Sequence, residues 1–76
     1  MILCQVCSRL EPSKVLSGLE NVGFVVVKAD DETRFVAADR LNVKPERHVL
    51  VCRGQVAHTM VGSKVPVDAA VVAVVD

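Results

Sequence analysis

The sequence predicts a small all-β fold, and three observations support this class. Hydrophobic residues make up 51% of the chain, and valine is the commonest of them, with a branched side chain that favours strands. Aromatic residues account for only 3% of the chain. Turn-forming residues separate the valine-rich runs at intervals typical of strands. Because 76 residues provide room for one hydrophobic core, we expect residues 1–76 to form a single domain.

Apolar runs bounded by turn residues predict five strands, over residues 2–10, 23–29, 33–38, 48–53 and 69–75. In the first strand, Ile2, Cys4 and Val6 would share one face of the extended chain. The acidic residues 30–32 separate the second strand from the third, which indicates a solvated hairpin tip. The last strand is an unbroken run of Ala and Val, typical of a strand covered on both faces. Its residues from Val71 to Val75 should alternate between the core and an outer face.

Three connections join these strands. Residues 11–21 mix turn-formers with apolar residues, so we expect a loop that packs on the barrel. Residues 39–47 predict a turn or short connection. Residues 55–61 fit one or two helical turns, which would form a short helical insert after the fourth strand. Five such strands favour a closed or nearly closed barrel, because closure removes exposed strand edges.

The balance of charge excludes several classes of partner. Nine Lys and Arg stand against nine Asp and Glu, which gives a formal net charge of zero. A general nucleic-acid binder or a protein that binds anionic membranes would carry an excess of basic residues.

The chain shows no signal-peptide pattern and no apolar run of membrane-spanning length, so we expect a cytoplasmic protein. Its apolar content exceeds what a small monomer hides, which predicts contact with another subunit.

The cysteines and histidines do not form a recognisable metal site or catalytic site. Cys4 and Cys7 have the spacing of half a zinc knuckle, but in a strand they would point to opposite faces. Cys52, His48 and His58 lack paired ligand spacing. The sequence does not indicate a pair of residues that could act as nucleophile and base. A domain of this size also has little room for an active-site cleft. We therefore expect reduced, buried or interfacial thiols, no metal, no cofactor and no enzymatic activity.

Two other functions remain open from the residues alone. A five-stranded barrel is compatible with a small OB-type binding module, although readers of single-stranded nucleic acid need a basic groove and stacking aromatic residues. The chain has two Phe, no Trp and no Tyr, so we expect no nucleic-acid partner. The second alternative is a small oligomeric scaffold.

Four segments resemble the EutN/CcmL-type vertex proteins of carboxysomes and related metabolic microcompartments. They are Val36-Ala-Ala-Asp39, Val49-Leu-Val-Cys-Arg-Gly54, Ala57 and Pro66-Val-Asp-Ala-Ala-Val-Val-Ala-Val-Val-Asp76, of which the closing segment is the most specific. The resemblance covers nearly the whole chain. It implies a non-enzymatic pentamer of five-stranded OB-like barrels that closes the corner where hexameric shell proteins meet. The resemblance does not decide between a pentamer and a hexamer. It also does not decide whether the compartment is a carboxysome or a metabolosome.

The resemblance also suggests residues near a subunit interface or the oligomer axis. The family's Gly-Ser-x-Ala-Arg stretch corresponds here to Gly54, Gln55, Val56, Ala57 and His58. If His58 replaces that arginine, its charge would depend on pH near neutrality, whereas the charge of arginine would not.

Two aspartates and one loop complete the set of candidate residues. Asp68, which precedes the last strand, and Asp39, at the end of the third, would each fix a turn through backbone hydrogen bonds or bridge to the next subunit. The family's glycine-rich turn is replaced here by residues 41–47, which predict a stiffer and more charged loop.

Overall fold

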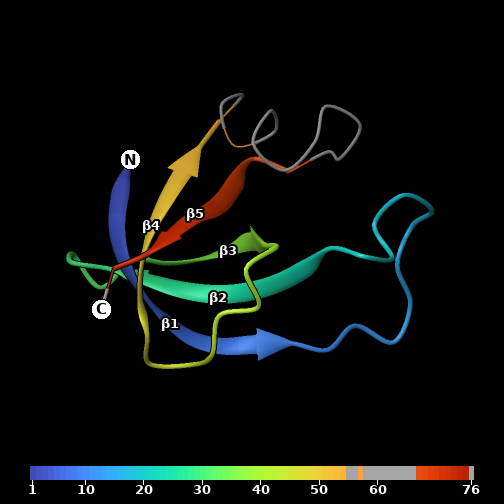
Figure 1. Cartoon of the computed structure of the whole chain (residues 1–76), viewed down its shortest axis with the longest axis horizontal. Coiled ribbons are helices and arrows are strands. Elements are labelled where there is room, and N and C mark those ends of the chain that lie inside the picture. The colour runs from blue at the N-terminus through green and yellow to red at the C-terminus, as the bar shows by residue number, and fades with distance from the viewer. Residues whose placement is uncertain (55–56, 58–66, 76) are drawn as a thin grey trace.

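The computed structural model describes residues 1–54, 57 and 67–75, and these residues form a barrel of five strands (Figure 1). The strands are β1 (Ile2–Leu10), β2 (Gly23–Ala29), β3 (Arg34–Asp39), β4 (His48–Arg53) and β5 (Ala69–Val74). The predicted bounds of the first, second and fourth strands are confirmed. The third strand begins and ends one residue later than predicted, and the fifth ends one residue earlier.

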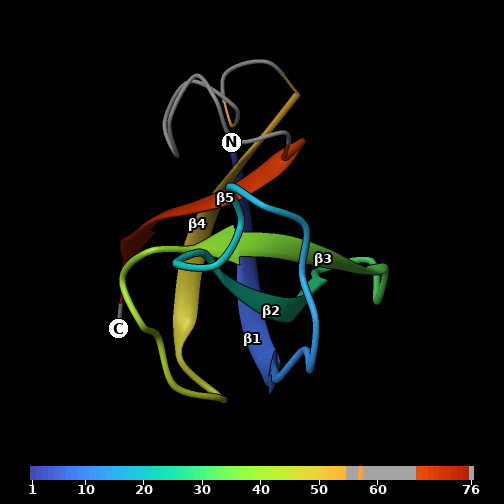
Figure 2. The ribbon, with the colours of Figure 1, turned by 90° about the vertical axis from the view of Figure 1, so that its right-hand side faces the viewer.

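The barrel closes in the order β1-β2-β3-β5-β4. Neighbouring strands are antiparallel except β3 and β5, which are parallel. The long strand β1 allows closure because its first residues pair with β4 and its later residues pair with β2. Figure 2 shows the strands crossing at steep angles around a common centre. Every strand thus has two neighbours, which removes the unpaired edges that a valine-rich sheet would otherwise expose.

The interior of the barrel is filled mainly by valine. The largest fully buried side chains come from three strands: Val6 of β1, Val25 and Val27 of β2, and Val49 and Val51 of β4. Short branched side chains suit this interior because a small barrel has little internal volume. Val43, from the connection between β3 and β4, is 4% exposed and packs into the same cluster.

A second cluster lies on the outside of the barrel. Its buried strand residues are Ala38, Cys52 and Ala70, which the strand registers place beside one another across β3, β5 and β4. Val22 and Ala57, outside the strands, are buried against them. The predicted packing of the loop over residues 11–21 is confirmed in part, because Leu19 packs against this cluster whereas Val15 and Leu16 are exposed.

A β-bulge in β1 changes which side chains in the second half of the strand face the core. The register with β2 shifts between Val6, which pairs with Val27, and Ser8, which pairs with Val26. Strict alternation from Val6 would turn Ser8 and Leu10 toward the core, yet both are exposed. The bulge therefore directs Leu10 outward.

The alternation predicted along the last strand is wrong, because a second irregularity interrupts the pairing of β4 with β5. The register between β4 and β5 shifts so that Val51 pairs with Val71, whereas Leu50 pairs with Ala73. Val71 is buried in the core and Val72 packs against the outer cluster, but Ala73 follows Leu50 to the outside instead of returning to the core.

The acidic segment forms the tip of the β2–β3 hairpin, as predicted. The backbone N–H of Ala29 donates to the carbonyl of Thr33 at 2.9 Å, and Glu32 adopts a positive φ of 71°. The backbone N–H of Thr33 also donates to Oδ1 of Asp31 at 3.0 Å. This hydrogen bond, followed by one from the Thr33 side chain, lowers the pKa of Asp31 below its ordinary value of 3.8.

The short helical insert predicted over residues 55–61 lies outside the described residues except for Ala57, so it stays a prediction. Within the described part of the chain, no helix is long and apolar enough to span a membrane.

Shortening a core valine should destabilise the barrel. Val49→Ala removes two fully buried methyl groups from the interior, and we expect the free energy of unfolding to fall by about 2 kcal/mol. Val15→Ala makes the same change at an exposed position and should have little effect. Urea denaturation of the two variants at one protein concentration measures the difference, and equal midpoints would contradict this assignment of the core.

The hairpin tip should weaken in acid. Because folding lowers the pKa of Asp31, the stabilising contribution of its carboxylate is present above pH 3.8 and is lost as the pH falls through the lowered value. NMR titration of the carboxyl carbon should give a midpoint below 3.8 for Asp31. Asp31→Asn should remove this part of the pH dependence of unfolding, and an unchanged pH profile would argue against the contribution.

Candidate functional site

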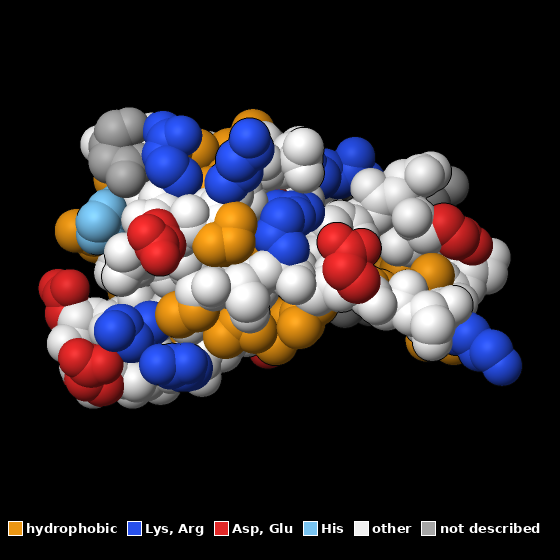
Figure 3. Space-filling view, turned by 90° about the horizontal axis from the view of Figure 1, so that it is seen from below, with side chains coloured by type: hydrophobic (Ala, Val, Ile, Leu, Met, Phe, Trp, Pro, Cys, Tyr) orange, Lys and Arg blue, Asp and Glu red, His pale blue; other side chains and the backbone are white. Residues whose placement is uncertain are grey.

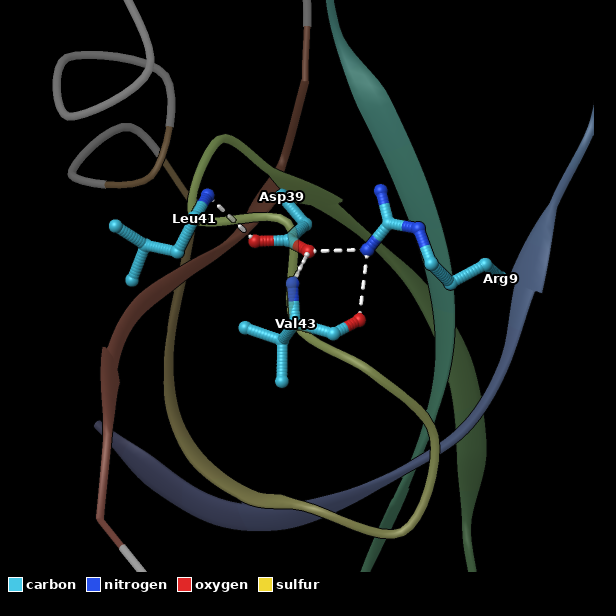
Figure 4. Close-up of polar contacts among 4 residues, drawn as sticks. All are labelled: Arg9, Asp39, Leu41 and Val43. Atoms are coloured by element: carbon cyan, nitrogen blue, oxygen red, sulfur yellow. Dashed lines mark hydrogen bonds and ion pairs between the residues drawn. The ribbon is translucent and has the colours of Figure 1, made fainter.

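The most deeply buried polar side chain among the described residues is that of Asp39, at the end of β3 (Figure 4). Its Oδ1 accepts the backbone N–H of Leu41 at 2.8 Å, and its Oδ2 accepts the backbone N–H of Val43 at 2.7 Å. Nη1 of Arg9 lies 2.5 Å from the same Oδ2. The predicted turn role of Asp39 is confirmed, since its carboxylate holds the first residues after the strand.

Arg9, next to the last residue of β1, connects this turn to that strand. Its Nη1 donates both to Asp39 and to the carbonyl of Val43, at 2.8 Å. The guanidinium lies over Gly23, where an added Cβ would come within 2.5 Å of Nη2 of Arg9 and 2.8 Å of the Asp39 carbonyl oxygen. A side chain at the start of β2 would therefore force the guanidinium and the Asp39 backbone to shift. The sequence analysis did not identify Arg9, because only the bulge in β1 brings its side chain to this position.

The connection between β3 and β4 closes one end of the barrel. Asn42 adopts a positive φ of 56°, and Val43 then enters the core. Further along, the backbone N–H of Glu46 donates to the carbonyl of Val6 at 2.7 Å, and the N–H of Val6 donates to the carbonyl of Arg47 at 2.9 Å. These contacts tie the end of the loop to β1. The stiffness predicted for residues 41–47 stays a prediction.

Three of the six predicted interface residues lie in the described part of the chain, and they gather where β4 ends and β5 begins. The backbone N–H of Gly54 donates to the carbonyl of Asp68 at 2.7 Å. Gly54 has a φ of +74° and open space where a side chain would be, so its role is a backbone conformation and not a close approach. Ala57 is 0% exposed and packs in the outer cluster of its own chain.

The side chain of Asp68 is exposed, and the turn role predicted for its carboxylate stays a prediction, because residues 58–66 before it lie outside the described residues. Its backbone carbonyl accepts the hydrogen bond from Gly54. Gln55, Val56 and His58 lie outside the described residues.

The described residues contain no group of three or more His, Cys, Asp and Glu that could hold a metal ion. The cysteines are free thiols, with Cys4 and Cys52 buried and Cys7 half-buried. Burial, followed by the nearby charge of Asp30, raises the pKa of the Cys4 thiol. Cys4 is therefore held in the thiol form, which is not the reactive one.

Exposed hydrophobic side chains gather on two walls of the barrel. The first, which we call the valine face, comprises Val26 and Val36 with Leu10 and Phe24 beside them. Val26 and Val36 are direct partners in the β2–β3 register and both point away from the core, with Val36 48% exposed. Leu10 pairs with Phe24 one row further along and is 41% exposed.

The second wall, which we call the leucine face, comprises Leu3, Leu50, Ala73 and Val75. Leu3 of β1 pairs with Leu50 of β4, and Leu50 pairs with Ala73 of β5, so the three form a row across adjacent strands. Leu3 is 45% exposed. The N–H of Val75 donates to the carbonyl of His48 at 3.0 Å, which extends the face past the end of β5.

A closed barrel with a buried structural ion pair, free thiols and two apolar outer walls defines a structural protein suited to assembly. A family model for the ethanolamine utilisation protein EutN and carboxysome proteins matches residues 1–76. The chain therefore belongs to the EutN/CcmL family. No curated protein matches the sequence significantly.

Several solved structures are similar to the whole chain. The pentameric shell protein of the RMM microcompartment is 26% identical with a TM-score of 0.89, and the match covers 100% of this chain and 91% of that one. CcmL of Nostoc sp. PCC 7120 is 28% identical with a TM-score of 0.90, covering 100% and 89%. EutN of Escherichia coli is 26% identical with a TM-score of 0.87, covering 100% and 85%. These proteins include structural shell components, and the family resemblance expected from the sequence is confirmed.

Removing the carboxylate of Asp39 should be costly. Asp39→Ala leaves the Arg9 guanidinium, whose side chain is 23% exposed, without its ion-pair partner and leaves two backbone N–H groups unpaired. We expect the free energy of unfolding to fall by about 3 kcal/mol. Asp68→Ala, at an exposed aspartate, provides the matched control and should change it little. Chemical denaturation compares the two, and similar losses would contradict the role given to Asp39.

Proposed function

We propose that the chain is a non-enzymatic shell protein that forms the pentameric cap at the vertices of a bacterial microcompartment in the cytoplasm. The observation that supports this most directly is the family match over residues 1–76, together with the similarity over the whole chain to a pentameric shell protein. The two apolar walls fit this role, because a subunit that only functions as a monomer gains nothing from exposing them.

The physical need for such a cap follows from the geometry of a closed shell. Flat hexameric tiles cannot close on themselves, and fivefold positions supply the missing curvature. A cyclic assembly that closes after five copies needs a heterologous contact, in which each subunit uses two different surfaces. Hexameric shell proteins of the same compartment are then the outer partners of the pentamer. The balanced charge supports no nucleic-acid or membrane partner.

We extend the proposal to the architecture of the chain. Residues 1–76 act as a single domain, which agrees with one continuous barrel core. The barrel is of the OB type, since it has five strands with the fifth inserted between the third and the fourth. The short helical insert over residues 55–61 stays a prediction from the sequence.

The segment after β4 is proposed to lie near a subunit contact or the oligomer axis. Gly54, Gln55, Val56, Ala57 and His58 form this segment, and Asp68 lies beside its start through the backbone bond to Gly54. The exposure of Gly54 and Asp68 leaves both accessible to a neighbouring subunit. Ala57 would support the segment from within its own chain.

Native mass spectrometry of the purified protein, repeated on dilution, tests the oligomer. We expect a pentamer that persists at low concentration, because a closed ring breaks two contacts for each subunit that leaves. Co-expression with hexameric shell proteins should give closed shells only when this chain is present, as judged by electron microscopy.

A hexamer would contradict the vertex role, but the protein could still be a component of the shell. A persistent monomer would favour the alternative of a small OB-type binding module, for which salt-sensitive binding of an oligonucleotide is the check. A different, stable oligomer that leaves shells open would favour an oligomeric scaffold.

A further inference from the structure

We propose that adjacent subunits meet by placing the valine face of one copy against the leucine face of the next. This inference rests on the proposed function, because it assumes that copies of the chain form a ring. The occupant of each face is thus a second copy of this chain.

The two faces lie on different walls of the same barrel. The valine face is centred on the β2–β3 pair, whereas the leucine face is centred on β4, which contacts neither of those strands in the closed order. A heterologous contact needs such a pair of separate surfaces, whereas an isologous dimer needs only one that matches itself. The family relationship to a pentameric shell protein makes a second copy the partner that such a pair of surfaces fits.

The composition of both faces agrees with an interface. On the valine face, the outward residues that follow Val26 and Val36 along the hairpin are Lys28 and Arg34, which pair in the register. Apolar residues bordered by charged ones are typical of a buried centre with a polar rim. Figure 3 shows a strip of hydrophobic side chains that ends at basic ones in this manner.

Beside the leucine face lies a hollow that could receive a side chain of the neighbouring copy. A hollow of about 420 Å³ opens beside Leu3, with Met1 and Phe35 in its apolar lining and Asp30, Asp31 and Arg53 at its polar positions. The guanidinium of Arg53 lies 4.5 Å from the centre of the Phe35 ring, which fixes one side of the hollow. A protruding apolar side chain from the neighbouring copy would fill this space. Asp30 and Asp31 come from the tip of the β2–β3 hairpin, so the hollow lies between that tip and Leu3 of the leucine face.

Neither face is needed to hold its own barrel together. Val36 and Leu3 point away from a core that Val25, Val27 and Val49 fill from the inside. Charged residues at these two positions should therefore leave the fold intact while blocking association, which makes the inference testable by substitution.

The experiment uses two single variants, Val36→Glu and Leu3→Glu, each purified as the full chain and shown by circular dichroism to retain the β fold. The Val36→Glu variant keeps a usable leucine face, and the Leu3→Glu variant keeps a usable valine face. Native mass spectrometry of each variant alone should show loss of the pentamer and only monomer. An equimolar mixture should show a mixed dimer with one copy of each, because a single intact contact remains.

The control is Leu16→Glu, which places the same charge at a leucine that is 76% exposed in the β1–β2 connection, outside both faces. It should remain pentameric. If either face variant stayed pentameric, that face would not take part in the contact. A dimer of either variant with itself would indicate an isologous contact. Because the mixed dimer has one contact and no ring closure, the mixture is measured up to the highest soluble concentration, and a mixture that stays monomeric there would also overturn the pairing.

The failure of this inference and the failure of the proposed function remain distinguishable. A parent protein that never forms a pentamer refutes the vertex role itself. A pentameric parent whose face variants also form pentamers refutes only the assignment of the two faces.

Discussion

The buried carboxylate of Asp39 is the contact on which the shape of this barrel depends. It joins the ends of two strands through Arg9 and holds the backbone of the turn that follows β3. That turn delivers Val43 into the core, where it closes one end of the barrel. A charged group can be buried here at acceptable cost because each of its oxygens has hydrogen-bond partners. The glycine at position 23 is part of the same arrangement, since a Cβ there would come too close to the guanidinium and to the Asp39 carbonyl oxygen.

Two irregularities in the strands decide what the outer surface presents. The bulge in β1 turns Leu10 outward and brings Arg9 to Asp39, so one local change both exposes an apolar residue and completes the ion pair. The shift between β4 and β5 places Ala73 beside Leu50 on the outside. Bulges are common where a barrel must bend, because the extra residue increases the local twist of the strand. Here they also shape the two walls through which we propose that subunits associate.

A valine-rich barrel faces a conflict between filling its interior and remaining soluble. Closure gives every strand two neighbours, and the outer cluster around Ala38, Cys52 and Ala70 hides part of the remaining apolar surface under the chain's own connections. The valine and leucine faces are the apolar strand surfaces that these connections leave open. A structural role in a shell explains why such surfaces persist, since association buries them and each subunit needs two.

The sequence by itself determined the class of fold, most of the strand bounds and the family, because apolar runs of strand length and turn residues are local signals. It also identified Asp39 and Gly54, whose positions at the ends of strands indicate turns. Only the tertiary structure showed that Arg9 pairs with Asp39 across 30 positions of the chain, that Gly23 makes room for this pair, and that Leu10 and Ala73 face outward. The physical reason is that alternation along a strand holds only while the register is unbroken. A single bulge reverses every later side chain, and its position is set by pairing with a partner strand that the local sequence does not reveal.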